Sequence, residues 1–270
     1  MKIALFSQSL FALSLEDAIR TTAEVGFEAI ELACVEPHLD HDTAVKHPAA
    51  IARQIRDAGL NVAALSLFNN FTEPADAHQV EMAKAFIALA PLFQTKLLKL
   101  TPGPPASRDA EERQWHHLAD ALDELVPAAR KTGVRLAFET HMRQLTDTLA
   151  SSERFLALAP ADCVGLTVDF SNLSFAGEDM SQVISRLGSR IYHTHVKNGW
   201  VDAQGRWHFG PLDTGLTDYA RVLSLLQAAG YGGYLSIECL GPDARTDPAG
   251  TARRDLARLQ RYLQDAGGQA

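Results

Sequence analysis

The stretch Leu136-Ala137-Phe138-Glu139 decides the fold, because it has the form of a short buried strand that ends in a carboxylate. Three later stretches repeat this form: Leu166-Thr167-Val168-Asp169, Ile191-Tyr192-His193-Thr194-His195 and Leu235-Ser236-Ile237-Glu238. Side chains of a strand alternate between its two faces, so the polar end residue and its apolar neighbour point in opposite directions. This pattern is typical of barrel strands that turn apolar side chains toward outer helices and polar ones toward one mouth.

Strand-like and helix-like segments alternate along the sequence, which favours a parallel sheet wound with crossover helices. Eight such pairs close a barrel, and the 270 residues are close to the roughly 250 that such a barrel needs. We therefore predict an α/β fold, a single (β/α)8 TIM barrel with outer helices, formed as one domain by residues 1–270. Strands are expected near 3–7, 29–34, 62–68, 96–101, 135–140, 164–169, 191–197 and 234–239. Helices are expected near 14–25, 47–58, 76–93, 108–132, 146–159, 179–188, 217–229 and 248–266.

The capping and turn residues of the sequence agree with these segments. Ser14 and Thr217 stand where N-cap residues of helices belong. Four glycines each end a predicted helix shortly before a strand, where the left-handed backbone of a C-cap is common: Gly26, Gly59, Gly133 and Gly230. The richest turn segments, 101–105 and 205–215, follow the fourth and seventh strands at the mouth where barrel enzymes keep their substrate-contacting loops.

The composition excludes several classes of protein. A hydrophobic content of 46% is enough for a large core, and a net charge of −8 argues against nucleic acid as a partner. Cys34, Cys163 and Cys239 are odd in number and share no CxxC spacing, which is typical of reduced thiols. No apolar run approaches the roughly 18 residues of a membrane span. We therefore expect a soluble, cytoplasmic protein that contacts no membrane, and the sequence leaves a homo-oligomer open.

The four polar strand ends predict a metal site. A single carboxylate at a strand end is more often solvated or paired with a base than bound to metal. Here every strand from five to eight supplies an inward ligand near its carboxyl end, and three carboxylates converging there would repel one another without a cation. We expect Glu139, Asp169, His195 and Glu238 to bind one divalent ion. Mostly oxygen ligands favour Mn²⁺, with Mg²⁺, Co²⁺ and Zn²⁺ left open.

Such a site suits proton transfer on a carbonyl compound. Four protein ligands leave about two octahedral positions free, enough for the vicinal oxygens of a hydroxy-ketone. A polarised carbonyl acidifies the adjacent carbon, and an enediolate follows when its proton is removed. Glu139 and Glu238 lie on non-adjacent predicted strands, so they are the natural pair to take and return that proton.

The quartet resembles the xylose isomerase-like TIM-barrel superfamily, the sugar phosphate isomerase/epimerase family. The resemblance covers essentially the whole chain, from Ile30-Glu31-Leu32 to Ser236-Ile237-Glu238. It implies the ligand set Glu139, Asp169, His195 and Glu238, with the two glutamates also serving as the acid/base pair, and a small-molecule carbohydrate as substrate. The closest match is in strands five to eight.

Further residues at the mouth are candidates for substrate contact. Many epimerases of the family carry a substrate-contacting His three residues after the strand-six Asp, whereas this chain has Asn172, which can form hydrogen bonds but cannot carry a proton. Lys197 shares the parity of His195 and is expected to act in catalysis by holding charge on a substrate oxygen. His141, Arg206 and Lys99 are the other candidates for substrate binding. Lys99 and Glu31 could also pair across the barrel, and His193 is expected to be a packed, hydrogen-bonded histidine.

Three enzyme classes fit the resemblance to different degrees. The first is a metal-dependent isomerase or epimerase of a keto-sugar. The second is a dehydratase of the inosose or dehydroshikimate type, which begins with the same proton abstraction and then expels a β-hydroxyl. An endonuclease IV-like nuclease shares the barrel but needs three zinc ions and many histidines, and here the net charge has the wrong sign for DNA. The loops carry no clear glycine-rich phosphate cradle, which favours an unphosphorylated sugar.

Overall fold

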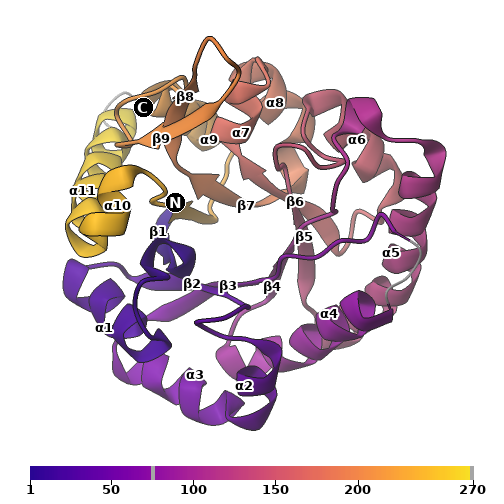
Figure 1. The fold of residues 1–270 in the computed structure, drawn as a ribbon, viewed down its shortest axis with the longest axis horizontal. Helices are drawn as coiled ribbons and strands as arrows, with labels where there is room; N and C mark the ends of the chain where they lie inside the picture. Colours follow the sequence, from indigo (N-terminus) through magenta and orange to yellow (C-terminus); the bar gives the residue numbers. More distant parts are fainter. Residues whose placement is uncertain (74–76, 268–270) are drawn as a thin grey trace.

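Eight parallel strands close into a barrel in the computed structural model, which describes residues 1–73 and 77–267. Around the ring the order is β1, β10, β7, β6, β5, β4, β3 and β2, with helices on the outside (Figure 1). The predicted (β/α)8 barrel is therefore confirmed. The barrel strands are β1 (Lys2–Phe6), β2 (Ala29–Ala33), β3 (Asn61–Ser66), β4 (Leu97–Leu100), β5 (Arg135–Glu139), β6 (Val164–Asp169), β7 (Ile191–Val196) and β10 (Tyr234–Ile237).

Long helices follow most strands, and short ones were missed from the sequence. The longer helices are α1 (Leu15–Val25), α3 (Pro48–Asp57), α4 (Ala77–Leu89), α5 (Glu112–Thr132), α6 (Leu149–Leu158), α8 (Met180–Leu187), α9 (Tyr219–Ala228) and α11 (Pro248–Gly267). The missed helices are α2 (His41–Lys46), α7 (Phe170–Phe175) and α10 (Pro242–Thr246). They are too short to show a helical repeat of apolar residues. The predicted start of α4 at residue 76 lies outside the described residues.

The caps were mostly predicted correctly. The Ser14 side chain accepts a hydrogen bond from the Asp17 amide at 3.2 Å and caps α1. Thr217 does not cap α9, since that role belongs to Asp218, which accepts from the Arg221 amide at 3.1 Å. The Thr217 hydroxyl instead donates to Ser174 at 3.0 Å. All four predicted C-cap glycines, Gly26, Gly59, Gly133 and Gly230, have positive φ angles at or next to the ends of their helices.

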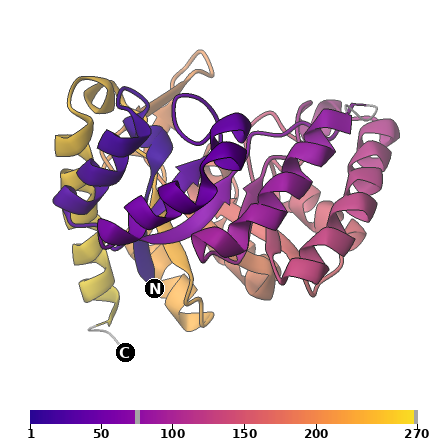
Figure 2. The same cartoon turned by 90° about the horizontal axis from the view of Figure 1, so that it is seen from below.

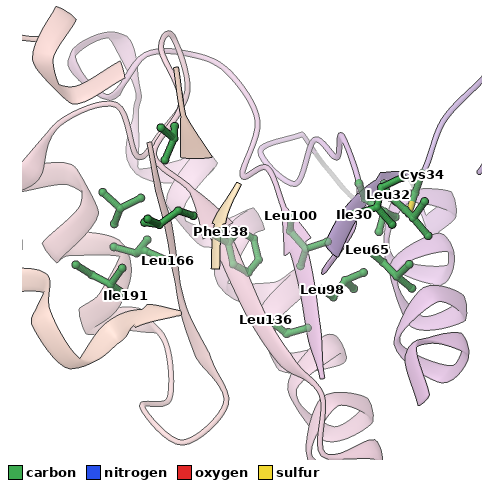
Figure 3. Packing of buried hydrophobic residues seen from close by; sticks show 14 of the residues in the cluster. Ile30, Leu32, Cys34, Leu65, Leu98, Leu100, Leu136, Phe138, Leu166 and Ile191 are labelled. Atoms are coloured by element: carbon green, nitrogen blue, oxygen red, sulfur yellow. Dashed lines mark hydrogen bonds between the residues drawn. The ribbon is translucent and has the colours of Figure 1, made fainter. Parts of the chain in front are cut away.

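The two faces of the barrel strands differ as the alternation predicts. Outward side chains such as Leu98, Leu136, Phe138 and Leu166 are fully buried against the helices (Figure 3). Small inward side chains fill the amino-terminal part of the barrel, where Ala4, Ala29 and Ala63 form a cluster and Ala64, Leu97 and Ala137 form another. Two residues further along β2, β3, β4 and β5 the inward positions are polar: Glu31, Ser66, Lys99 and Glu139. The apolar packing therefore supports a layer of charged side chains near the carboxyl ends of the strands.

A β-hairpin follows β7 and rises at the face opposite to the amino-terminal end of β1 (Figure 2). Its strands are β8 (Asn198–Val201) and β9 (Trp207–Gly210), which pair antiparallel. The sequence predicted only a loop at 205–215, so β9 is a correction. The hairpin needs Gly199, because a Cβ there would lie 2.0 Å from the His208 carbonyl oxygen. Within the described residues, none of the helices has the length and apolar character to span a membrane.

Candidate metal and proton-transfer site

Three of the four predicted metal ligands meet inside the barrel mouth. Glu139 ends β5, Asp169 ends β6 and His195 lies on β7, where Asp169 and His195 are register partners on neighbouring strands. One donor atom from each of the three lies within 4.8 Å of the other two. All three side chains are nearly inaccessible to solvent. Two carboxylates and one imidazole at this spacing form a donor set that suits a divalent cation such as Mn²⁺ or Mg²⁺.

Glu238, the fourth predicted ligand, reaches this group through a lysine. It directly follows β10, and its amide donates to the Val196 carbonyl at 2.9 Å. The Lys197 Nζ lies 2.6 Å from Glu238 Oε2 and 2.8 Å from Asp169 Oδ2. Among the described residues, the ion pair with Lys197 is the contact of the buried Asp169 Oδ2, which forms no further hydrogen bond. The oxygen thus faces one positive charge, and a divalent cation that displaces the ammonium fits the same place.

A second buried lysine, Lys99, forms an ion pair with Glu139. Lys99 Nζ lies 2.6 Å from Glu139 Oε2, and both side chains are buried. The other Glu139 oxygen lies 3.0 Å from His195 Nδ1. Lys99 therefore pairs with Glu139 rather than with Glu31. In the ring, the two strands between Glu139 and Glu238 are β6 and β7, which carry Asp169 and His195. Each glutamate thus has a lysine of its own, with the other two predicted ligands between them.

Glu31 on β2 is the functional candidate that sequence reasoning left without a defined role. Its Oε1 lies 2.9 Å from His195 Nε2, its Oε2 lies 2.7 Å from His193 Nε2, and the Ser66 hydroxyl also donates to it. Glu31 is fully buried, and β2 is separated from β7 by two strands, so these contacts cross the barrel interior. Because Glu31 holds Nε2, the Nδ1 of His195 is left facing Glu139. A carboxylate in this place fixes the orientation of the His195 ring, as the outer partners of metal-binding histidines do.

His193 is buried and hydrogen-bonded, as expected, but it is also part of a second group of three residues. Glu31, His193 and His195 have donor atoms within 4.8 Å of one another. Both groups contain His195, and neither includes a histidine from a helix or loop of the described chain. The signal for Glu31 in the sequence was its position, since an inward carboxylate between alanines in a buried strand requires a partner.

The electrostatics of the mouth are those of paired buried charges. Burial alone would lower the pKa of His195. The Glu31 and Glu139 carboxylates outweigh this effect and raise the pKa of His195 to about 10. Burial raises the pKa of Glu139, and this effect is overcome by Lys99 and His195, which hold it well below its usual range. The pKa of Asp169 is raised, by burial and by the neighbouring Glu238 and Glu139, against the opposing effect of Lys197. The sequence argument assigned the neutralisation of these carboxylates to a metal alone, whereas lysines share that role.

The remaining predicted contacts differ in their distance from the group. Asn172 lies on α7. Its backbone N–H donates to Asp169 Oδ1, and its side-chain Nδ2 donates to the Thr140 carbonyl, both at 3.0 Å. His141 is partly buried, contacts the Met142 carbonyl at 2.8 Å and lowers the pKa of Glu139. Arg206 is exposed near the tip of the hairpin and binds Asp202 at 2.8 Å. The structure thus brings Asn172 and His141 to the group, while Arg206 has its contacts within the hairpin.

Replacing Lys99 by methionine should lower the free energy of unfolding by about 3–5 kcal/mol, because it leaves the Glu139 carboxylate buried without its partner. Urea unfolding in the presence of EDTA measures the effect without any contribution from bound metal. Lys84→Met is the matched control. Lys84 also contacts carboxylates, those of Glu81 and Glu124, but at the surface, so the loss there should stay below about 1 kcal/mol. Equal losses for the two variants would contradict the importance of the buried pair.

Comparison with known proteins yields relatives with two kinds of activity. An inosose dehydratase of Lacticaseibacillus casei is 26% identical over 149 residues, which are 50% of this chain and 50% of that protein. An L-ribulose 3-epimerase of Mesorhizobium japonicum is 27% identical over 245 residues, covering 86% of this chain and 78% of that protein. The chain thus spans about half the length of the inosose dehydratase but most of the epimerase.

Solved structures show the same fold. The probable 3-DHS dehydratase involved in petrobactin synthesis from Bacillus anthracis superimposes with a TM-score of 0.81 at 20% identity, covering 96% of this chain and 99% of that chain. The family model for the xylose isomerase-like TIM barrel matches residues 19–262, and with them all barrel strands except β1. The chain belongs to the xylose isomerase-like TIM barrel family.

Proposed function

We propose that this protein is a divalent-metal-dependent isomerase or epimerase that moves a proton next to the carbonyl of a keto-sugar or hydroxy-ketone. The observation that carries the proposal is the pair of buried glutamates, each 2.6 Å from its own lysine, on either side of Asp169 and His195. Two carboxylates that face one site from separate strands suit removal of a proton at one face of a carbon and its return at the other. The match to an L-ribulose 3-epimerase supports the same conclusion.

Glu139, Asp169, His195 and Glu238 are the proposed ligands of one divalent ion, with Mn²⁺ ahead of Mg²⁺, Co²⁺ and Zn²⁺. The ion would supply polarisation of the substrate carbonyl. Three of these residues already have donor atoms within 4.8 Å of one another. Glu238 is linked to them through Lys197, which contacts both Glu238 and Asp169. Glu31 would fix the orientation of the His195 ring through Nε2. This arrangement leaves Nδ1 as the nitrogen that is directed to the site.

The acid/base roles fall to Glu238 and Glu139. One takes the proton from the carbon adjacent to the carbonyl, and the other delivers a proton to the opposite face of the same carbon. Lys99 keeps Glu139 in the ionised form in which it can accept a proton. Asn172, His141 and Lys99 are the proposed substrate contacts beside the group. Arg206, the fourth residue of the predicted set, pairs with Asp202 within the hairpin, so its contact with substrate stays a prediction.

Lys197 is the proposed stabiliser of the negative charge that grows on the substrate oxygen. It is buried between Asp169 and Glu238, and its ammonium lies 5.6 Å from the centre of the Phe209 ring on the hairpin. These contacts fix a cation at the boundary between the proposed ligands and the hairpin. A charge held there acts more strongly on the transition state than on the ground state.

Lys197→Met should therefore lower kcat about 10–100-fold while changing KM less, since the lost contact is made mainly in the transition state. The measurement is steady-state kinetics on whichever keto-sugar is turned over, together with metal analysis of the purified variant. Metal content is expected to stay at the wild-type value. An unchanged kcat would reject the catalytic role, and a large rise in KM alone would assign Lys197 to ground-state binding.

A dehydratase is the second candidate, and the match to an inosose dehydratase favours it. The first step would be the same proton abstraction. The β-carbon would then lose its hydroxyl, with the electrons of the broken C–H bond forming the new double bond and a proton joining the leaving oxygen as water. The glutamate that took the proton from carbon could donate it to the leaving oxygen, and Lys197, next to Glu238, could hold that oxygen.

Incubation of a panel of keto-sugars and keto-inositols in D₂O with Mn²⁺ separates the two candidates. An isomerase or epimerase incorporates deuterium at carbon and otherwise keeps the substrate composition. A dehydratase gives a product that lacks one water. Deuterium exchange without water loss supports the first proposal, and water loss replaces it by the second. Absence of both reactions across the panel would reject the two together.

A further inference from the structure

A pocket of about 480 Å³ adjoins the candidate site beside the hairpin. The loop after β4 contributes Arg108, the loop after β5 contributes Arg143, α7 contributes Asn172, and the hairpin contributes Trp207. Asn172 connects this pocket to the site, because its backbone N–H donates to Asp169 Oδ1 at 3.0 Å. The pocket and the site therefore share Asn172 as a neighbour.

Arg143 is an exposed residue that lines the pocket and lies over one of its aromatic rings. Its guanidinium lies 4.3 Å from the centre of the Trp207 ring, and its φ angle of 61° is in the left-handed region. A residue other than glycine adopts this region at a cost of the order of 1–3 kcal/mol, so the surrounding structure must hold it there. Among the described residues no carboxylate pairs with Arg143. Its N–H groups are thus without an acidic partner in a pocket that is open to a ligand.

A second arginine of the chain, Arg154, also lies over a tryptophan ring and serves as a comparison for Arg143. Arg154 lies over Trp115 at the same distance of 4.3 Å, on the outer helices. Its guanidinium, however, is already bound to the Glu112 carboxylate at 2.6 Å. The two pairs have the same distance between guanidinium and ring centre, and they differ in that the surface pair includes an acid while the pocket pair does not.

Two other polar groups line the pocket. Asn172 is 2% exposed, and its Oδ1 has no hydrogen-bond partner among the described residues. This oxygen is an acceptor, which suits a hydroxyl of the substrate and not the anionic group itself. Arg108 is an exposed side chain that pairs with Asp109 at 3.5 Å, and it adds a second guanidinium to the lining. The carboxylate in the lining, Asp147, already accepts from the Ser107 amide at 3.3 Å.

We propose that this pocket binds an anionic group, a carboxylate or a phosphate, at the end of the substrate remote from the reacting carbonyl. The inference rests on the proposed function for the position of that carbonyl. A guanidinium stacked on an indole keeps its in-plane N–H groups for bidentate binding of such an anion. Arg143 is then a residue that determines specificity for acidic over neutral sugars, with Asn172 spanning the distance to the site.

The test measures binding of malonate and of inorganic phosphate by isothermal titration calorimetry, with the metal-loaded protein and after EDTA treatment. Anion binding should survive EDTA, since it does not use the metal. Arg143→Met should weaken it roughly tenfold or more, whereas the control Arg154→Met should leave it unchanged. Arg143→Lys should keep part of the affinity for the anion. This variant replaces Arg143→Met in the test if the methionine variant does not fold. The tighter of the two anions identifies the source as carboxylate or phosphate.

Loss of anion binding on EDTA treatment, or equal affinities for the Arg143 and Arg154 variants, would overturn the inference. Its failure is distinct from that of the proposed function. Turnover of a neutral keto-sugar without any Arg143-dependent anion binding keeps the proposed function and rejects the pocket. Anion binding that depends on Arg143, together with no turnover or exchange in D₂O, keeps the anion pocket and rejects the proposed function.

Discussion

Glu238→Gln should lower kcat by roughly 10²–10⁴-fold, the range for loss of a general base. Glutamine keeps the size of the side chain and one oxygen donor, but it cannot take a proton. The position is buried beside Lys197, at 5% exposure, so water is poorly placed to replace the carboxylate. Some metal affinity should remain, because an amide oxygen can still ligate and the other three proposed ligands are unchanged.

The control for this variant is Glu153→Gln. Glu153 also pairs with a base, Arg186, but it lies on the outer helix α6. It should keep wild-type kinetics. Circular dichroism and metal analysis show whether each protein is folded and loaded. A Glu238→Gln enzyme with more than about a tenth of wild-type kcat would rule out the proton-transfer role, since that loss is smaller than a lost base produces.

The barrel could be predicted because its determinants are local. Each strand is a short apolar run with alternating faces, and glycines or capping residues separate it from the helices. Phe138 and Glu139 therefore had to lie on opposite sides of one strand, and the structure buries the first under helices and the second in the mouth. The hairpin strand β9 lacked such a signal, because all four of its residues are only partly buried and glycines surround it.

The connections within the site could not be predicted in the same way. Parity gives the face of each side chain, but the register between strands and the shape of the ring decide which inward residues meet. Glu31 reaches His195 across two intervening strands, and Lys99 turns to the adjacent Glu139. The sequence offered both as inward charges without determining their partners. Long-range geometry, rather than residue type, separates a ligand from the group that orients it.

The largest effects on metal binding are expected from alanine at Glu139, Asp169 or His195, whose donor atoms already lie together. Each variant should lose more than about 100-fold in Mn²⁺ affinity, because removal of a group that merely orients a ligand costs about 10–100-fold. Glu238→Ala should fall in the same range if Glu238 leaves Lys197 to join the ion. Metal analysis after equilibrium dialysis gives the affinities. Wild-type affinity in three of these four variants would show that the site is assigned to the wrong residues.

Glu31→Gln separates the ligands from the residue that orients them. Its carboxylate contacts His195 only through Nε2, so the variant should lose about 10–100-fold in Mn²⁺ affinity and remain clearly tighter than His195→Ala. Glu28→Gln is the matched control, since Glu28 lies just before β2 and accepts a hydrogen bond from the Ile3 amide at 2.9 Å, at the opposite end of the barrel. Its affinity should equal that of the wild type. If Glu31→Gln binds as weakly as His195→Ala, Glu31 is itself a ligand, and the ion lies in the group formed by Glu31, His193 and His195 instead.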